Sequence, residues 1–376
     1  MRGPLFTRIY LFALCMLYFL SSSAQDLPID PHATSETVAL YRHLHAIGNT
    51  GYLVGHQDDL AYGYDWKYQE GRSDIHDVTG DYPALYGWEL GRIELDHAVN
   101  LDSVPFDRMR SYIREAYRRG GVITISWHLN NPLTGGTAWQ PAPGTVASIL
   151  PGGERNTLYK TWLDKVAAYL QSLKDEHDRP IPVILRLFHE LNGSWFWWGG
   201  RNCTPGELKE LWHFTVAYLR DEKGLHNLLF AFNTDRFASK EAYLERYPGD
   251  EWVDITGFDI YQRGGNAAFL EEFKRTLTLL EEIAGERHKI PALTEFGYNG
   301  LPDSAWWTSV LSPALQDHHL AYIMAWRNAG RNQQGQSEFY VPYKGQSSAG
   351  DFIKFYKDKK TLFQKDIAGG KLYRQN

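Results

Sequence analysis

The stretch from Pro182 to Arg201 combines an apolar run with residues that can transfer protons and stack on a ligand. Its first half reads Pro-Val-Ile-Leu-Arg-Leu-Phe, and its Val-Ile-Leu core is typical of a strand buried on both faces. A carboxylate can protonate a glycosidic oxygen, and indole rings stack on the C–H faces of sugars. The stretch therefore indicates a carbohydrate-cleaving site, unless Glu190 is a capping or salt-bridging residue beside tryptophans of the core. The residues that follow the strand are His189, Glu190, Trp195, Phe196, Trp197 and Trp198.

A second candidate carboxylate, Glu295, lies near the end of another predicted strand at 291–297. In a parallel barrel the carboxyl ends of all strands share one face, so the side chains of Glu190 and Glu295 can converge there. Two converging carboxylates are typical of glycoside hydrolysis. The other polar residues predicted at strand ends are His56, Glu89, His128, His189, Asn233, Asp259, Tyr261, Trp326 and Arg327.

Eight strand candidates that alternate with helices or long loops must position these side chains. This alternation predicts an α/β fold, a (β/α)8 TIM barrel in a single domain over 25–376. An open doubly wound sheet is the competing architecture, but no Gly-rich dinucleotide loop follows the first strand. The predicted strands are 53–57, 84–90, 122–128, the run from 182, 228–233, 254–261, 291–297 and 321–327. The predicted helices are 34–47, 105–119, 156–173, 204–221 with a capping box at its start, 268–283 and one from about 351 to near the end.

The first 24 residues predict a cleaved signal peptide, because Arg2 and Arg8 accompany a short apolar run over 9–20 and small residues occupy 22–24. That run is too short to span a membrane. Cys15 raises lipid anchoring as a less favoured alternative, since it lies inside the apolar run. Two glycosylation sequons, at 192–194 and 202–204, fall inside the candidate site and would obstruct it if they were used. A bacterial protein exported to the periplasm or the medium is therefore expected.

The composition excludes some classes of partner. The formal net charge of −6 disfavours nucleic acid or an anionic membrane. Cys203 is the one cysteine outside the predicted signal, so no intramolecular disulfide is expected. Aromatic residues make up 14% of the chain, with 13 Trp, and this excess indicates a ligand that stacks. Nothing in the sequence indicates an oligomer, so a monomer is expected.

The motifs together resemble glycoside hydrolase family 26, most of whose members are β-mannanases. The resemblance covers nearly the whole mature chain, with its motifs in the right order at the predicted strand ends. It implies a retaining mechanism, with Glu190 as general acid and base and Glu295 as nucleophile. It implies mannan, galactomannan or glucomannan as the substrate and no cofactor. The motifs are Trp127-His128, His189-Glu190 with Asn192-Gly193 and Trp195, Asp259 with Tyr261, Thr294-Glu295-Phe296-Gly297, and Trp326-Arg327.

The same resemblance implies supporting roles in substrate binding. Tyr261 is expected to hold the nucleophile through its hydroxyl, and His189 replaces the Asn with which related barrels bind an equatorial 2-hydroxyl. Trp326 is expected under the sugar before the scissile bond and Trp195 under the one after it. His128 and Arg327 are expected to bind hydroxyls, although each histidine has the alternative of merely orienting a neighbour. The family pattern places Asp where Glu89 stands, so Glu89 is given no role.

Several alternatives remain at this stage. A zinc site is disfavoured because the segment from His189 to Gly193 lacks the second histidine of the H-E-x-x-H pattern, and no metal is expected. The same chemistry on mixed-linkage β-glucan or β-1,3-xylan is the nearest rival, and a catalytically silent glycan-binding protein is the rival of another class. Whether the enzyme cuts internally or releases mainly mannobiose depends on the loops 62–71, 129–153 and 327–345.

Overall fold

The structure is a computed structural model that describes residues 27–331 and 335–374. The predicted signal peptide at 1–24 lies outside these residues. Eight parallel strands form a closed barrel, because β10 pairs with β1 in addition to its neighbour β9. The predicted TIM barrel is therefore confirmed. The strands are β1 (Tyr52–Gln57), β4 (Leu85–Glu89), β5 (Val122–Ser126), β6 (Val183–Arg186), β7 (Leu228–Asp235), β8 (Ile255–Tyr261), β9 (Ile290–Gly297) and β10 (Tyr322–Ala325).

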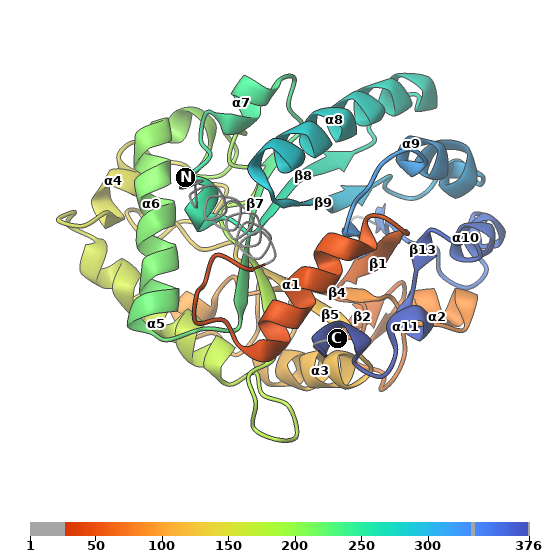
Figure 1. Cartoon of the computed structure of the whole chain (residues 1–376), viewed down its shortest axis with the longest axis horizontal. Coiled ribbons are helices and arrows are strands. Elements are labelled where there is room, and N and C mark those ends of the chain that lie inside the picture. Colours follow the sequence, from red (N-terminus) through yellow and green to blue (C-terminus); the bar gives the residue numbers. More distant parts are fainter. Residues whose placement is uncertain (1–26, 332–334, 375–376) are drawn as a thin grey trace, which may run out of the picture.

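Helices surround the strands and bury them, which is why the strands read as continuous apolar runs (Figure 1). The larger helices are α1 (Ser35–Ile47), α3 (Phe106–Arg118), α5 (Asn156–Gln171), α6 (Pro205–Ala217) and α8 (Asn266–Arg287). Helix α6 begins with the predicted capping box, in which the Thr204 side chain accepts from the Glu207 backbone N–H and Glu207 bonds back to Thr204. The sequence pattern thus located this helix start correctly.

The long predicted loops contain short elements that sequence periodicity did not reveal. The hairpin of β2 (Tyr62–Gly63) and β3 (Trp66–Lys67) follows β1, and the hairpin of β11 (Gly330–Arg331) and β12 (Ser337–Glu338) follows β10. The predicted final helix is instead α10 (Ala349–Tyr356), β13 (Thr361–Leu362), which pairs with β1, and α11 (Gln364–Ile367). The other short helices are α2 (Asp74–Thr79), α4 (Thr145–Ile149), α7 (Lys240–Leu244) and α9 (Ser312–Leu315), with 3-10 or π turns at Ile93–Leu95, Gly200–Asn202, Tyr218–Glu222, Asp250–Trp252, Trp307–Leu311 and Lys371–Tyr373.

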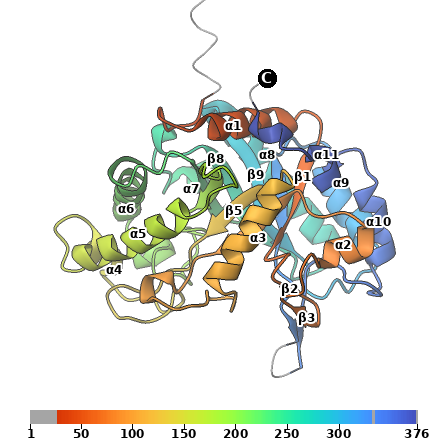
Figure 2. The same cartoon turned by 90° about the horizontal axis from the view of Figure 1, so that it is seen from below.

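The two ends of the barrel carry different parts of the chain. Helix α1, which leads into the first strand, lies at the opposite end of the molecule from the β2–β3 hairpin that follows that strand (Figure 2). The hairpin therefore lies at the carboxyl ends of the strands, where barrels of this type place their active sites. Within the described residues, no helix is long and apolar enough to cross a membrane.

Candidate active site

The turn after β6 places Glu190 at the mouth of the barrel. The strand ends at Arg186, and the chain then reverses direction through Phe188 and Glu190, whose φ angles of 45° and 51° are left-handed. The Gly193 N–H donates to the Glu190 carbonyl at 2.9 Å and closes the turn. A left-handed conformation costs a residue with a side chain about 1 kcal/mol or more. The surrounding contacts thus hold Glu190 in a backbone conformation that it would not adopt alone.

An irregularity in β9 places Glu295 beside Glu190. The pairing of β8 with β9 skips one residue, since Phe258 lies opposite Leu293 while Asp259 lies opposite Glu295. Thr294, the skipped residue, donates its hydroxyl to Asp259 Oδ1 at 2.7 Å, so it faces the barrel interior. In a regular strand the next side chain would point outward. The bulge allows Thr294 and Glu295 to face the same side.

The two predicted carboxylates therefore come together, and a third joins them. One carboxylate oxygen from each of Glu190, Glu295 and Asp259 lies within 4.8 Å of the other two. Asp259 is fully buried and also accepts from the Asn233 side chain at 2.7 Å. Three acids this close repel one another when they are all ionised, so protons or cations must reduce their net charge.

Arg186 supplies one compensating positive charge. Its side chain is 1% exposed, donates to Asp259 Oδ2 from Nη1 at 3.1 Å and pairs with Glu295 through Nη2. Arg186 was not among the predicted site residues, because its position inside a buried apolar strand concealed it. An arginine within such a run was a usable signal, since a buried charge requires a partner.

The negative charge that Arg186 leaves uncompensated contributes to a shift in the pKa of Glu190. Burial and then the neighbouring Glu295 raise the pKa of Glu190 to about 7, while the Trp195 indole N–H, which donates to Glu190 Oε2 at 2.7 Å, opposes the rise. The Tyr261 hydroxyl donates to Glu295 Oε2 at 2.6 Å. Burial, followed by Glu295, raises the pKa of Tyr261, so this hydroxyl keeps its proton. Glu190 can thus carry a proton near neutrality while Glu295 receives two donated hydrogen bonds.

The aromatic cluster after Glu190 divides into core and surface. Trp197 and Trp198 are fully buried, whereas the Trp195 side chain is 40% exposed. A further exposed indole, Trp139 at 47%, lies over His128 with the ring centroids 5.1 Å apart. Trp139 lies in the long loop predicted at 129–153 and was not among the predicted site residues. Trp326, at the end of β10, is half-buried.

The two candidate histidines contact each other. His128 Nε2 lies 2.9 Å from His189 Nε2, and His128 Nδ1 lies 2.8 Å from Glu89 Oε2. Both ring nitrogens of His128 therefore have protein partners. His189 Nδ1 is buried and has no hydrogen-bond partner among the described residues. Glu89, which received no role from the sequence, is thus connected to both histidines.

Arg327 also forms ion pairs with other residues of the protein. It pairs through Nη1 with Asp102 and through Nε with Glu338 of β12, at 3.3 Å. Its guanidinium lies 5.9 Å from the centre of the neighbouring Trp326 ring. These contacts fix the position of Arg327 between the loop that follows β4 and the one that follows β10.

In the described part of the chain, the group of Glu190, Asp259 and Glu295 is the one that brings three possible metal ligands together. Its electrostatics do not favour a cation. The Arg186 guanidinium already bonds both Asp259 and Glu295, and the Tyr261 hydroxyl occupies the second Glu295 oxygen. The residues present therefore suit proton transfer better than metal coordination.

Comparison with known proteins identifies the family of this barrel. The sequence pattern of glycosyl hydrolase family 26 matches residues 29–336. The chain belongs to this family. A family 26 β-mannanase structure from Bacteroides ovatus is 43% identical, has a TM-score of 0.87 and aligns over 91% of this chain and 98% of its own.

The matches to two curated relatives cover only part of each relative's length. A mannan endo-1,4-β-mannosidase from Bifidobacterium adolescentis is 33% identical over 355 residues, which cover 89% of this chain and 35% of the relative. Another protein of the same name, from Bacillus subtilis, is 33% identical over 196 residues, which cover 50% of this chain and 53% of the relative. The chain thus spans between about a third and a half of the length of these two relatives.

Proposed function

We propose that this family 26 protein is a retaining endo-β-1,4-mannanase that cleaves mannan, galactomannan or glucomannan. The observation that carries the proposal is the approach of Glu190 and Glu295 at the ends of β6 and β9, with carboxylate oxygens within 4.8 Å of each other. Retaining glycosidases hold their two carboxyl groups about 5 Å apart, whereas inverting enzymes leave room between them for a water molecule. The names of the relatives from Bacteroides ovatus and Bifidobacterium adolescentis support the choice of mannan.

The proposed reaction has two steps. In the first, Glu190 gives its proton to the glycosidic oxygen while a Glu295 oxygen attacks the anomeric carbon, so the C–O bond breaks and a glycosyl ester forms. The ester removes the negative charge of Glu295, and Glu190 becomes more acidic. In the second step, Glu190 takes a proton from water, the water oxygen attacks the same carbon, and Glu295 leaves as a carboxylate. Each residue ends in its starting protonation state.

Neighbouring residues assist the two carboxylates. Tyr261 and Arg186 fix the direction of Glu295 by bonding its two oxygens. Trp195 has an exposed face for the sugar after the scissile bond, and Trp326 serves the sugar before it. His189 precedes Glu190 in the chain, and its Nδ1 is buried without a hydrogen-bond partner among the described residues. His128 and Arg327 help to shape the substrate site while their polar atoms remain bonded to the protein.

Two loops that contact each other support a proposal about the product pattern. The Tyr64 and Tyr343 rings are parallel with centroids 3.8 Å apart, and Arg331 Nε donates to the Tyr64 hydroxyl at 3.3 Å. These contacts join the loop after β1 to the loop after β10, on the side of the barrel mouth where Trp326 lies. We propose that this junction limits the number of sugars bound before the scissile bond, so that mannobiose is a main early product.

The experiment that tests the proposal is a time course of products from the mature protein, residues 25–376, on several polymers. We expect mannooligosaccharides from unbranched mannan and galactomannan, with mannobiose prominent from the start. Hydrolysis of mixed-linkage β-glucan or β-1,3-xylan alone would overturn the substrate. An even early mixture of longer oligosaccharides would overturn the proposed limit at the hairpins. Binding of the polymers without hydrolysis would establish the glycan-binding alternative, and NMR of the anomeric proton of the first-formed product tests retention.

A further inference from the structure

The side chain of Glu89 is fully buried and both of its oxygens accept hydrogen bonds. Oε2 accepts from the Ser126 hydroxyl and from His128 Nδ1, each at 2.8 Å. Oε1 accepts from the His128 backbone N–H at 2.7 Å and from the Gly91 N–H at 2.5 Å. No Lys or Arg pairs with this carboxylate among the described residues, so His128 is its one candidate for a compensating positive charge. A buried carboxylate without such compensation is costly.

The hydrogen positions along this chain of contacts follow from the donors and acceptors. His128 Nδ1 faces a carboxylate oxygen, so it carries a hydrogen. Between His128 Nε2 and His189 Nε2, 2.9 Å apart, one hydrogen must lie on one of the two nitrogens. If it lies on His128, that ring is an imidazolium and His189 is neutral with its hydrogen on Nδ1. If it lies on His189, both rings are neutral and Glu89 has no counter-charge.

The groups around the two rings favour the first arrangement. Glu89, Glu295 and Asp102 place negative charge around His128, whereas Arg186 and His128 itself place positive charge near His189. Burial works to lower the pKa of His128, but Glu89 and then the other acids outweigh it and raise that pKa. Burial and then His128 lower the pKa of His189 well below its usual range. The rings of Trp139 and Phe196, which also contact His128, carry no charge.

We propose that Glu89 is a positioning residue that keeps His128 as an imidazolium and His189 as a neutral ring with its hydrogen on Nδ1. The positive charge is thereby held on the side of Glu295 and kept off the residue that precedes Glu190 in the chain. His189 then presents a hydrogen-bond donor, and no acceptor, at its one unpartnered nitrogen.

The first test uses the wild-type mature protein and does not depend on its activity. Nitrogen NMR of the histidine rings at pH 7, with signals assigned through His128→Gln and His189→Gln, reports which ring nitrogens carry hydrogen. We expect two protonated nitrogens on His128 and a single one, Nδ1, on His189. A singly protonated His128, or a hydrogen on His189 Nε2, would overturn the proposal even if the protein hydrolysed mannan as proposed.

The second test compares Glu89→Gln with a matched control, Glu94→Gln. Glu94 is a carboxylate 1% exposed that accepts from the Trp127 indole at 3.1 Å and the Asn130 N–H at 2.8 Å, without contact to His128. We expect Glu89→Gln to remove the second His128 proton at pH 7 and to lower kcat/KM by about 10- to 100-fold, the range for losing a partner that orients a histidine. Glu94→Gln should leave the His128 signals as in wild type, and Glu89→Asp, which keeps the charge, should retain most of the second proton.

The activity measurements in the second test rest on the proposed mannanase function, and they include a pH profile of kcat/KM. Loss of the positive charge in Glu89→Gln should move the acid limb of the profile to higher pH, and the basic limb should stay in place. Equal losses of activity in Glu89→Gln and Glu94→Gln, with the same His128 signals in both, would show that Glu89 is merely structural. A wild-type protein without hydrolytic activity would defeat the proposed function but leave the NMR result to decide this inference.

Discussion

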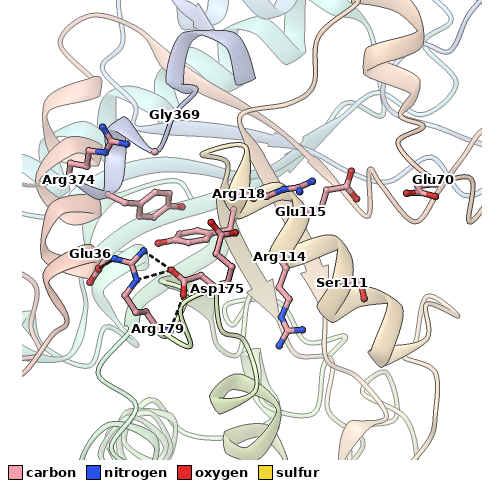
Figure 3. Close-up of a pocket in the computed structure, with 14 residues that line it drawn as sticks. Glu36, Glu70, Ser111, Arg114, Glu115, Arg118, Asp175, Arg179, Gly369 and Arg374 are labelled. Carbon is pink, nitrogen blue, oxygen red and sulfur yellow. Dashed lines mark hydrogen bonds and ion pairs between the residues drawn. The ribbon is translucent and has the colours of Figure 1, made fainter.

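A cluster of charged residues lies at each end of the barrel, and the two clusters differ in how deeply their arginines are buried. At the amino-terminal end, a hollow of about 840 Å³ is lined by acids and arginines, among them Arg118 just before β5 and Arg179 just before β6. Figure 3 shows Arg179 bonding both Asp175, at 2.7 Å, and Glu36, at 3.3 Å. At the carboxyl end, one buried arginine, Arg186, pairs with Asp259 and Glu295, and Glu190 lies close to both acids.

The difference affects the pKa values at the two ends. Arg179 is 54% exposed, and its backbone and side-chain donors outweigh burial and lower the pKa of Asp175, so that acid is simply ionised. By contrast, burial and then Glu295 raise the pKa of Glu190 to about 7. The hollow at the amino-terminal end holds acids that pair with an exposed arginine, whereas the carboxyl end holds three close acids and one buried arginine. The proposed active site is therefore identified by the shifted pKa of Glu190 and not by the presence of a hollow.

Replacement of the proposed nucleophile should have the largest effect. Glu295→Gln keeps the size of the side chain and an oxygen for the Tyr261 hydroxyl but cannot form the glycosyl ester. We expect kcat on mannan to fall by about 10⁴-fold or more, the scale for removing a covalent nucleophile. A thermal melt checks that the variant is folded. Activity within tenfold of wild type would refute the assignment of Glu295.

Replacement of the acid should depend on the leaving group. Glu190→Gln cannot protonate the glycosidic oxygen, and we expect a loss of about 10²- to 10⁴-fold on mannan. An aryl mannobioside with an acidic phenol needs no such proton, so its first step should be much less affected. Measuring the release of phenol in a stopped-flow burst separates the two steps. An equal loss on both substrates would contradict the role of Glu190 as acid.

The pH profile should show the raised pKa directly. Because Glu190 must be protonated in the free enzyme and its pKa is about 7, kcat/KM should decline above pH 7 by about tenfold per unit. The Glu190→Gln variant should lack this basic limb. The measurement is initial rates on mannan in buffers between pH 4 and 9 at constant ionic strength. A wild-type profile that stays flat to pH 9 would mean that another group, or none, supplies the proton.

Disruption of the amino-terminal cluster should have the smallest effect. Arg179→Gln removes the partner of Asp175 and Glu36, but an ion pair whose arginine is 54% exposed contributes little to stability. We expect kcat/KM and the basic limb near pH 7 to match wild type. The variant is assayed beside Glu190→Gln under the same conditions. A change in the pH profile would show that the two ends of the barrel are coupled.

The strand order and the positions of the two glutamates could be predicted because both depend on residues that are close together in the sequence. The apolar runs of β6 and β9 identify strands, and Glu190 and Glu295 lie at their ends in recognisable motifs. Family membership confirms the recognition of those motifs. The roles of the site residues stay predictions until the variants are measured.

The missed residues act through contacts that no local pattern encodes. Glu89 and His128 are 39 positions apart, and Arg186 and Glu295 are 109 apart. The β9 bulge leaves no periodic signal either, since one skipped residue changes which side chains face inward without changing their types. The hairpins β2–β3 and β11–β12 were read as loops because each holds only two residues per strand.

The sequence by itself determined the barrel class, the family and the residues capable of acid, base and nucleophilic chemistry, because hydrophobic periodicity and short motifs depend on near neighbours. Only the tertiary structure decided which of these residues share a proton, which carry a counter-charge and which rings face solvent. Those properties depend on burial and on distances of a few ångströms between strands far apart in the chain. Burial, and then the neighbouring Glu295, raise the pKa of Glu190 to about 7.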